Sequence, residues 1–313
     1  MLLTEQPILN AFTVDVEDYF HVAAFADQIA TSDWNDYESR VVGNTHRMLR
    51  LLDVYGVRGT FFILGWVADK YPTLVKDIQK SGHEIGCHSF WHQLVYEMTP
   101  DSFREDLRQA SQAIEQTTSD RVRAYRAPSF SITTKSLWAL DILIEEGFQI
   151  DASIFPIRHD RYGIPNAERF PHEIRRNAGR IREFPASVHR VWKMNLPVAG
   201  GGYFRLYPAA LSLRWLGMIN KRHARPFVFY VHPWELDPQQ PVMRGSFRSR
   251  WRHYQNLHTT EPKLHRLLRE FRFGTLSEAL AGMPCELDSS RIETDPQRHA
   301  SARETSLSNS NRG

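Results

Sequence analysis

The chain has 313 residues, 42% of them hydrophobic and 24% charged, so it can bury a substantial core in one large domain or two smaller ones. The net charge is only +3, and the basic residues are scattered, which argues against a nucleic acid partner. The two cysteines, Cys87 and Cys285, argue against a disulfide scaffold and fit a reducing compartment. The N-terminal residues contain no signal-peptide or transmembrane pattern, which predicts a cytoplasmic location with peripheral membrane association left open.

Short apolar runs alternate with amphipathic segments along the chain. The predicted strands are residues 8–16, 58–65, 83–88, 121–128, 149–153, 180–187 and 225–235. The predicted helices are residues 45–57, 72–82, 101–118, 134–148, 208–222 and 260–271, with a short strand and a closing helix in 272–282. Repeated β-then-α units predict parallel strands covered by helices. We therefore expect an α/β fold, a distorted (β/α) barrel of seven strands, with the chemistry where the strands end.

The organisation along the chain indicates one catalytic domain, residues 1–284. The periodicity fades over residues 157–202, which we interpret as an irregular insertion. From Cys285 the composition turns to Ser, Thr, Asn, Asp and Arg, so residues 285–313 are predicted to be a disordered tail.

Two groups of polar residues follow predicted strands. Asp15, Glu17 and Asp18 end the first strand, and such a cluster repels itself unless a positive charge compensates it. His88 and His92 follow another strand, and on a helical turn two histidines four apart face one side and can share a metal. Two histidines plus one of the acids would form a common divalent-metal triad. The alternative is two histidines with separate partners; the strand-end positions favour the metal.

Three further strand ends carry polar residues. Arg126 ends a strand and Pro128 turns the chain immediately, so the guanidinium can fix a carboxylate if the strand ends converge. Asp151 and Ser153 lie on one face of another strand end. His232 follows five apolar residues and is a candidate general acid, with a structural histidine bonded to the backbone as the alternative.

Together these stretches resemble the five ordered motifs of the polysaccharide deacetylases, carbohydrate esterase family 4. They are DVED, HSFWH, RAPSF, DASIF and YVHP, in the family's order within residues 12–233. The finer pattern resembles the branch associated with exosortase-linked exopolysaccharide loci. It comprises DVEDYFHV, ILGWVADKYP, YGIPNAERFPHEI and GGGYFRLYP.

The first motif departs from the family, which usually has two adjacent aspartates. Here Val16 follows Asp15, so the metal carboxylate must come from Glu17 or Asp18. We favour Glu17, because it lies two residues beyond Asp15 and therefore on the same strand face, whereas Asp18 would need a turn or bulge.

The resemblance implies a divalent metal, zinc, bound by His88, His92 and that acid. It also implies a role for each remaining polar residue: Asp15 as general base, His232 as general acid, Arg126 holding Asp15, and Asp151 tuning His232. The expected substrate-binding residues are Pro128, Phe130, Tyr162, Trp192, Tyr203 and Trp234, several of them in the irregular segment.

The expected function is a metal-dependent hydrolase that removes N-acetyl groups from N-acetylhexosamine units of a bacterial polysaccharide or its lipid-linked precursor, in the cytoplasm or at the inner membrane face. One alternative is an amidase for small cyclic or linear amides, with the same fold. Another is a glycoside hydrolase, which would use two carboxylates without needing metal. A third is a non-catalytic polysaccharide-binding homologue, against which the intact His88 and His92 pair, Asp15 and His232 argue.

Overall fold

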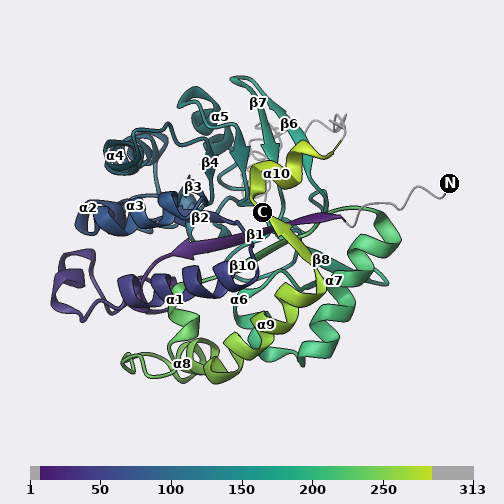
Figure 1. Ribbon diagram of the computed structural model, residues 1–313. Coiled ribbons are helices and arrows are strands. Elements are labelled where there is room, and N and C mark those ends of the chain that lie inside the picture. Colours follow the sequence, from purple (N-terminus) through teal and green to yellow (C-terminus); the bar gives the residue numbers. More distant parts are fainter. Residues whose placement is uncertain (1–7, 284–313) are drawn as a thin grey trace, which may run out of the picture.

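The structure is a computed structural model, and it describes residues 8–283; the predicted tail lies outside this range. A strongly curved central sheet is surrounded by helices (Figure 1). The strands are β1 (Leu9–Val16), β2 (Thr60–Ile63), β3 (Glu84–Cys87), β4 (Ala124–Tyr125), β5 (Ile150–Asp151), β6 (His172–Arg176), β7 (Gly179–Glu183), β8 (Val188–Val191), β9 (Met194–Pro197), β10 (Val228–Val231) and β11 (Arg272–Gly274).

Most of the helices follow a strand and cover the outer face of the sheet, as the alternating pattern predicts. They are α1 (Val41–Val54), α2 (Gly65–Lys70), α3 (Pro72–Lys80), α4 (Pro100–Thr118), α5 (Trp138–Glu145), α6 (Gly201–Leu206), α7 (Ala209–His223), α8 (Phe247–Tyr254), α9 (Thr260–Glu270) and α10 (Leu276–Ala281). Within residues 8–283, no helix is long and apolar enough to cross a bilayer.

The sheet is mixed and has nine strands, so the expected seven-stranded barrel is corrected. Its order is β10-β1-β2-β3-β4-β5-β7-β6, with β11 also paired to β1. All of these pairings are parallel except that between β6 and β7. In the described part of the chain this hydrogen-bonded path runs from β10 to β6 and does not return to β10.

The segment expected to be an irregular insertion contributes to the sheet. Residues 172–183 form the β6–β7 hairpin, and β7 pairs in parallel with β5 through Ile150–Arg182 and Asp151–Glu183. β7 coincides with the strand predicted at residues 180–187, whereas β6 was missed because its sequence HEIRR is mostly charged and lacks the apolar alternation that indicates a strand.

The chain then approaches β10 from the other side. The amide of Tyr230 donates to the carbonyl of Ala199 (2.8 Å), and Gly200 forms an isolated parallel bridge with Tyr230. Gly200 has φ +139°, and a Cβ there would lie 1.9 Å from the Tyr230 carbonyl oxygen. Only glycine allows this approach of two backbones.

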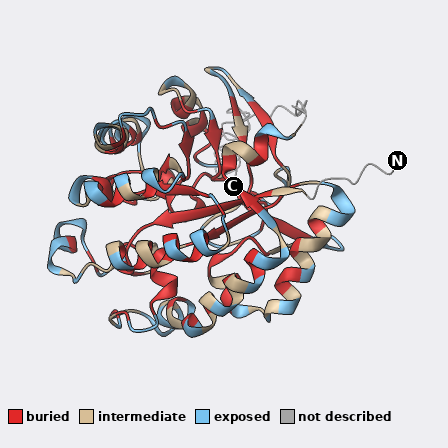
Figure 2. Cartoon of the chain, viewed as in Figure 1, coloured by how far each residue is buried: buried red, intermediate tan, exposed pale blue. Residues whose placement is uncertain are grey.

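Alternate side chains of the strands point into the curved sheet and form an inner apolar cluster that includes Ala11, Phe62, Ile150 and Val228. The central strands β1, β2, β4, β5 and β10 are buried on both faces (Figure 2), as expected for parallel strands between two apolar layers. α10 closes one end of this cluster, where the Leu276 amide donates to Thr60 Oγ1 at the start of β2. The opposite edge, at the carboxyl ends of the strands, carries the polar residues.

Candidate metal centre and active site

The structure brings a carboxylate and two histidines together at the carboxyl ends of β1 and β3. Ligand atoms of Glu17, His88 and His92 all lie within 4.8 Å of one another, and all three residues are buried. Glu17 directly follows β1 and His88 directly follows β3, and these strands flank β2. Parallel strands therefore place residues that are about seventy positions apart side by side.

The two histidines lie on an irregular turn, and the expected helical turn is corrected. Ser89 and His92 have φ +64° and +53°, a backbone region that non-glycine residues adopt only when their surroundings hold them there. Asp106 of α4 supplies that support, because its carboxylate accepts the amides of Phe90 (2.9 Å) and Trp91 (3.1 Å).

The donor atoms of this cluster fit a divalent cation. His88 Nδ1 lies 2.7 Å from the carbonyl oxygen of Arg126, which can only accept, so Nδ1 carries the proton and Nε2 keeps its lone pair. Burial lowers the pKa of His88 to about 4, which keeps it neutral, as a ligand must be. Glu17 Oε2 lies 2.7 Å from His92 Nε2, and His88 offers a ligand atom within 4.8 Å of both residues' ligand atoms, so the three side chains could share one cation.

Trp234 holds the remaining oxygen of Glu17. Its indole N–H donates to Glu17 Oε1 (3.1 Å). Burial raises the pKa of Glu17, but the neighbouring imidazoles, His92 first and then His232, outweigh burial and keep the pKa well below its usual range. Glu17 is therefore an ionised carboxylate with one free oxygen. Trp234, which was predicted to bind substrate, borders the cavity, but it is 4% exposed and its indole N–H is already bonded to Glu17.

Asp18 lies outside the cluster. One of its oxygens accepts the amides of Arg40 (2.8 Å) and Val41 (3.0 Å) and the hydroxyl of Ser39 (2.7 Å), while the other accepts the amide of Tyr19. Asp18 thus holds the start of α1. Of the two alternatives that the sequence left open, only Glu17 lies beside the histidines.

Asp15 and Arg126 form a buried ion pair beside this cluster. Arg126 Nη1 donates to Asp15 Oδ1 (2.8 Å) and to Thr13 Oγ1 (2.7 Å), and its Nε donates to the carbonyl of Ala152. The guanidinium lies 4.4 Å from the ring centroid of Phe62. Arg126 is therefore rigid, and the predicted contact between Arg126 and Asp15 is present. Asp15 Oδ2 lies 3.8 Å from His232 Nε2.

His232 follows β10, and its partner is Glu235. His232 Nδ1 lies 2.8 Å from Glu235 Oε1, and Glu235 Oε2 lies 2.7 Å from Arg205 Nε. Burial lowers the pKa of His232, but the hydrogen bond to Glu235 and the charges of Glu17, Glu235 and Asp15 raise it to about 9. The imidazole is thus held with Nε2 toward Asp15 and with its proton retained.

The structure contradicts the predicted pairing of Asp151 with His232. Asp151 Oδ1 accepts the hydroxyl of Ser153, which itself accepts the amide of Ala127 (2.8 Å). Asp151 also faces Glu183 across β5 and β7. Burial raises the pKa of both carboxyls; the charge of Asp151 and the hydrogen bond between the two raise the pKa of Glu183 further, whereas that hydrogen bond lowers the pKa of Asp151. Asp151 therefore supports the strand end beyond Arg126.

Sequence reasoning missed Glu235 and Arg205. The sequence did contain a signal for Glu235: the proline after His232 favours a turn. In the structure Pro233–Leu236 form a 3-10 turn, which brings the third residue after His232 back to its ring. Arg205 has no local signal: it lies in α6, and its Nη1 donates to the backbone carbonyls of His253 and Gln255, which are distant in sequence.

A cavity of about 400 Å³ opens over these groups. The residues that line it include Asp15, Glu17, His88, His92 and His232, together with four of the six predicted substrate-binding residues: Phe130, Tyr162, Tyr203 and Trp234.

Two predicted substrate-binding residues lie elsewhere. Pro128 is buried and does not line the cavity. Trp192 is 95% exposed in the turn between β8 and β9, also outside the cavity lining. Trp192 was chosen for its residue type, which does not indicate the direction in which a hairpin points.

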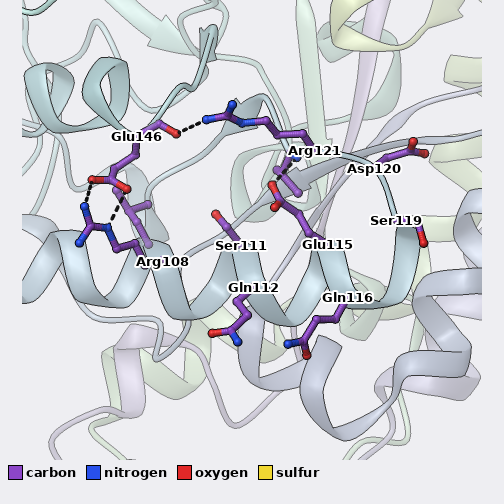
Figure 3. A pocket seen from close by; sticks show the side chains of 11 residues that line it. Arg108, Ser111, Gln112, Glu115, Gln116, Ser119, Asp120, Arg121 and Glu146 are labelled. Carbon is purple, nitrogen blue, oxygen red and sulfur yellow. Dashed lines mark hydrogen bonds and ion pairs between the residues drawn. The ribbon is translucent and has the colours of Figure 1, made fainter.

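A second, larger hollow of about 730 Å³ lies beside α4 (Figure 3). Its basic residues are already paired: Arg108 pairs with Glu146 (2.9 Å), and Arg121 Nη2 donates to the Glu146 carbonyl. The amide of Val122 donates to Glu115. It contains no cluster of metal-ligating side chains among the described residues, so size alone does not mark the chemical site.

Comparisons with known proteins agree with this arrangement. Residues 31–143 match the family model of the polysaccharide deacetylases, and residues 152–281 match a domain of unknown function, DUF3473. The chain is 30% identical over 98 residues to a peptidoglycan-N-acetylglucosamine deacetylase of Bacillus cereus, covering 31% of this chain and 36% of that protein. It is 32% identical over 94 residues to the peptidoglycan-N-acetylmuramic acid deacetylase PdaA of Bacillus subtilis, covering 30% and 35%. The chain thus spans about a third of the length of these curated relatives.

A crystal structure from Mycobacterium smegmatis, provisionally described as a polysaccharide deacetylase, matches 94% of this chain and 97% of its own, with a TM-score of 0.59 and 20% identity. This likeness shows a shared α/β fold. The family model and the relatives together support the relationship of this chain to the polysaccharide deacetylases of carbohydrate esterase family 4.

Proposed function

We propose that this protein is a metal-dependent hydrolase that removes N-acetyl groups from N-acetylhexosamine units of a bacterial polysaccharide or of its lipid-linked precursor. One observation carries the proposal: a potential metal triad, an Arg-held aspartate and a Glu-held histidine all border one cavity. The matching relatives are described as peptidoglycan deacetylases, which supports the reaction class. The exosortase-linked branch and the cytoplasmic location remain predictions.

Glu17, His88 and His92 would hold the metal, and we propose zinc, which commonly takes two histidines, one carboxylate and an open position. When bound there, the metal would supply Lewis acidity to an acetamide carbonyl and to a water molecule.

The protein's own residues provide the proton transfers. Asp15, kept oriented by Arg126, accepts the proton of the attacking water. His232 donates a proton to the amine nitrogen as the carbon–nitrogen bond breaks, so the products are acetate and a free amino sugar. Asp15 Oδ2 and His232 Nε2 lie 3.8 Å apart, so base and acid flank the same part of the cavity.

The proposal is tested by acetate release from an N-acetylglucosamine oligomer, with zinc added or chelated. We expect zinc-dependent release that Asp15→Asn abolishes, and loss of stoichiometric metal binding in His88→Ala/His92→Ala. Asp33→Asn and His46→Ala change an acid and a histidine outside the cavity lining and serve as matched controls. Release by the Asp15 variant at the wild-type rate would reject the assigned base, and hydrolysis of small cyclic amides alone would favour the amidase.

A further inference from the structure

A stretch of the chain bordering the cavity is basic and contains no acid. Residues 238–260 include Arg244, Arg248, Arg250 and Arg252 and no Asp or Glu. All four arginines are exposed, and none has an ion-pair partner within the described part of the chain. The net charge of the whole chain is only +3, so this concentration of unpaired positive charge is local.

Large apolar side chains are exposed along the same stretch. Val242 is 65% exposed, Phe247 82% and Trp251 51%. Phe247 and Trp251 are four residues apart in α8 and therefore share one helix face. Arg248 and Arg252 are likewise four apart, where like charges repel. An anion outside the protein would relieve that repulsion.

The stretch is anchored, so these side chains are presented in a fixed arrangement. His253 is buried, with Nε2 2.8 Å from Gln240 Oε1, and the Tyr254 hydroxyl donates to the carbonyl of Pro241 (2.9 Å). Ser246 caps α8 by accepting the amide of Ser249 (3.1 Å). Most of the outer surface of α8 is exposed, at the edge of the fold (Figure 2).

The anchored face adjoins the cavity. Ser249, Trp251, Arg252, His253 and Gln255 line the cavity that contains Asp15 and His232. Whatever binds the exposed side of α8 therefore lies next to the cavity mouth.

We propose that α8 and the preceding residues 242–245 dock on an anionic lipid bilayer. Arginine guanidinium groups bind lipid phosphates, while Phe247 and Val242 need an apolar phase beneath those phosphates. A bilayer offers both layers. A nucleic acid or an acidic polysaccharide offers the charge, but neither offers an apolar phase for the aliphatic side chain of Val242. Docking in this way places the cavity mouth at the membrane surface, and it does not depend on the proposed hydrolysis.

The test is sedimentation of the full chain with vesicles of phosphatidylcholine alone or mixed with phosphatidylglycerol, at low and high salt. We expect binding only to the phosphatidylglycerol vesicles, weakened by salt. Each basic residue near an anionic surface contributes about fivefold in affinity, so Arg248→Gln/Arg250→Gln should weaken binding roughly 25-fold. Phe247→Ser should weaken it as well.

Two control variants distinguish binding through α8 from non-specific binding of the protein to vesicles. Trp192→Ser removes an even more exposed aromatic, and Lys221→Gln/Arg222→Gln removes two charges from α7; both should bind vesicles like the wild type. Equal binding to both vesicle types, unchanged binding by the α8 variants, or equally tight binding to a soluble oligonucleotide would each overturn the proposal. Thermal unfolding checks that these surface variants are folded.

Discussion

Glu235→Gln tests the carboxylate that the structure pairs with His232. Glutamine has the same length and can still accept the Nδ1 proton, so the substitution removes the charge and keeps the geometry. The pKa of His232 is raised from 6.5 to about 9, a preference for the protonated form of roughly 3 kcal/mol. Glu235 contributes to it through both its hydrogen bond and its charge. We therefore expect the variant to lower this pKa by at least about one pH unit, or ~1.4 kcal/mol.

The assay is the pH dependence of kcat/KM for acetate release by the zinc-loaded enzyme. A general acid must be protonated, so activity falls as the pH rises through its pKa. The alkaline limb should consequently move to lower pH in the variant. Because the folded pKa of His232 is the higher one, its contribution to stability is complete below pH 6.5 and is lost as the pH rises towards 9. In urea unfolding, the free energy of unfolding should therefore decrease less in the variant than in the wild type between pH 6.5 and pH 9.

Arg205 requires a control, because Glu235→Gln leaves its guanidinium buried at 2% exposure without a counter-charge. Breaking such a pair costs about 3–5 kcal/mol. The double variant Arg205→Gln/Glu235→Gln should regain part of that stability, and the alkaline limb of its kcat/KM profile should remain at the lower pH. An unmoved alkaline limb in a folded, zinc-binding Glu235→Gln protein would refute the role assigned to Glu235.

Three further predictions concern the metal ligand, a buried histidine and the backbone beside β10. Glu17→Gln should lose stoichiometric zinc by elemental analysis, whereas Asp18→Asn should keep it and unfold about 1–2 kcal/mol more easily, because it weakens the acceptor at the start of α1. Burial and the charge of Arg58 lower the pKa of His83 to about 4, and the neutral ring accepts the Gly59 amide. The stability that His83 contributes is therefore present above pH 6.5 and is lost as the pH falls towards 4. In urea unfolding, His83→Asn should lose less stability than the wild type over that pH range. Gly200→Ala should lower the free energy of unfolding by about 3 kcal/mol or more, since its Cβ would meet the Tyr230 carbonyl; unchanged thermal stability would contradict the close approach.

The residues of the site were predictable where a strand end fixes their position. Asp15, His88, Arg126 and His232 each end or follow a parallel strand, and parallel strands bring their carboxyl ends to one edge. Apolar runs identify such strands, so the convergence of these residues followed from local patterns. The choice of Glu17 followed from the two-residue period of a strand.

Other features depend on contacts that local patterns do not encode. The resemblance implied that Asp151 tunes His232, but its carboxyl faces Glu183 of β7, and which neighbour a strand-end carboxylate faces is not encoded in the local pattern. β6, which pairs antiparallel with β7, and β11, which pairs with β1, change the sheet from the expected seven parallel strands to a mixed sheet of nine. The sequence also did not determine the direction in which the Trp192 side chain points, because a hairpin turn can point toward or away from a cavity without any change in sequence pattern.

The two halves of the chain supply different parts of the site. The first half provides Glu17, His88 and His92, with Arg126 on Asp15. His88, His92 and Arg126 lie within residues 31–143, which match the polysaccharide deacetylases, and Asp15 and Glu17 precede that region. His232, Glu235 and Arg205 all lie in residues 152–281, which match the domain of unknown function, and α8 lies there too. If the proposed function holds, that second region sets the protonation of the leaving group and borders the cavity mouth. Differences in substrate and in pH dependence from other deacetylases should therefore map to residues 152–281, and the Glu235→Gln pH profile is the most direct measurement of that contribution.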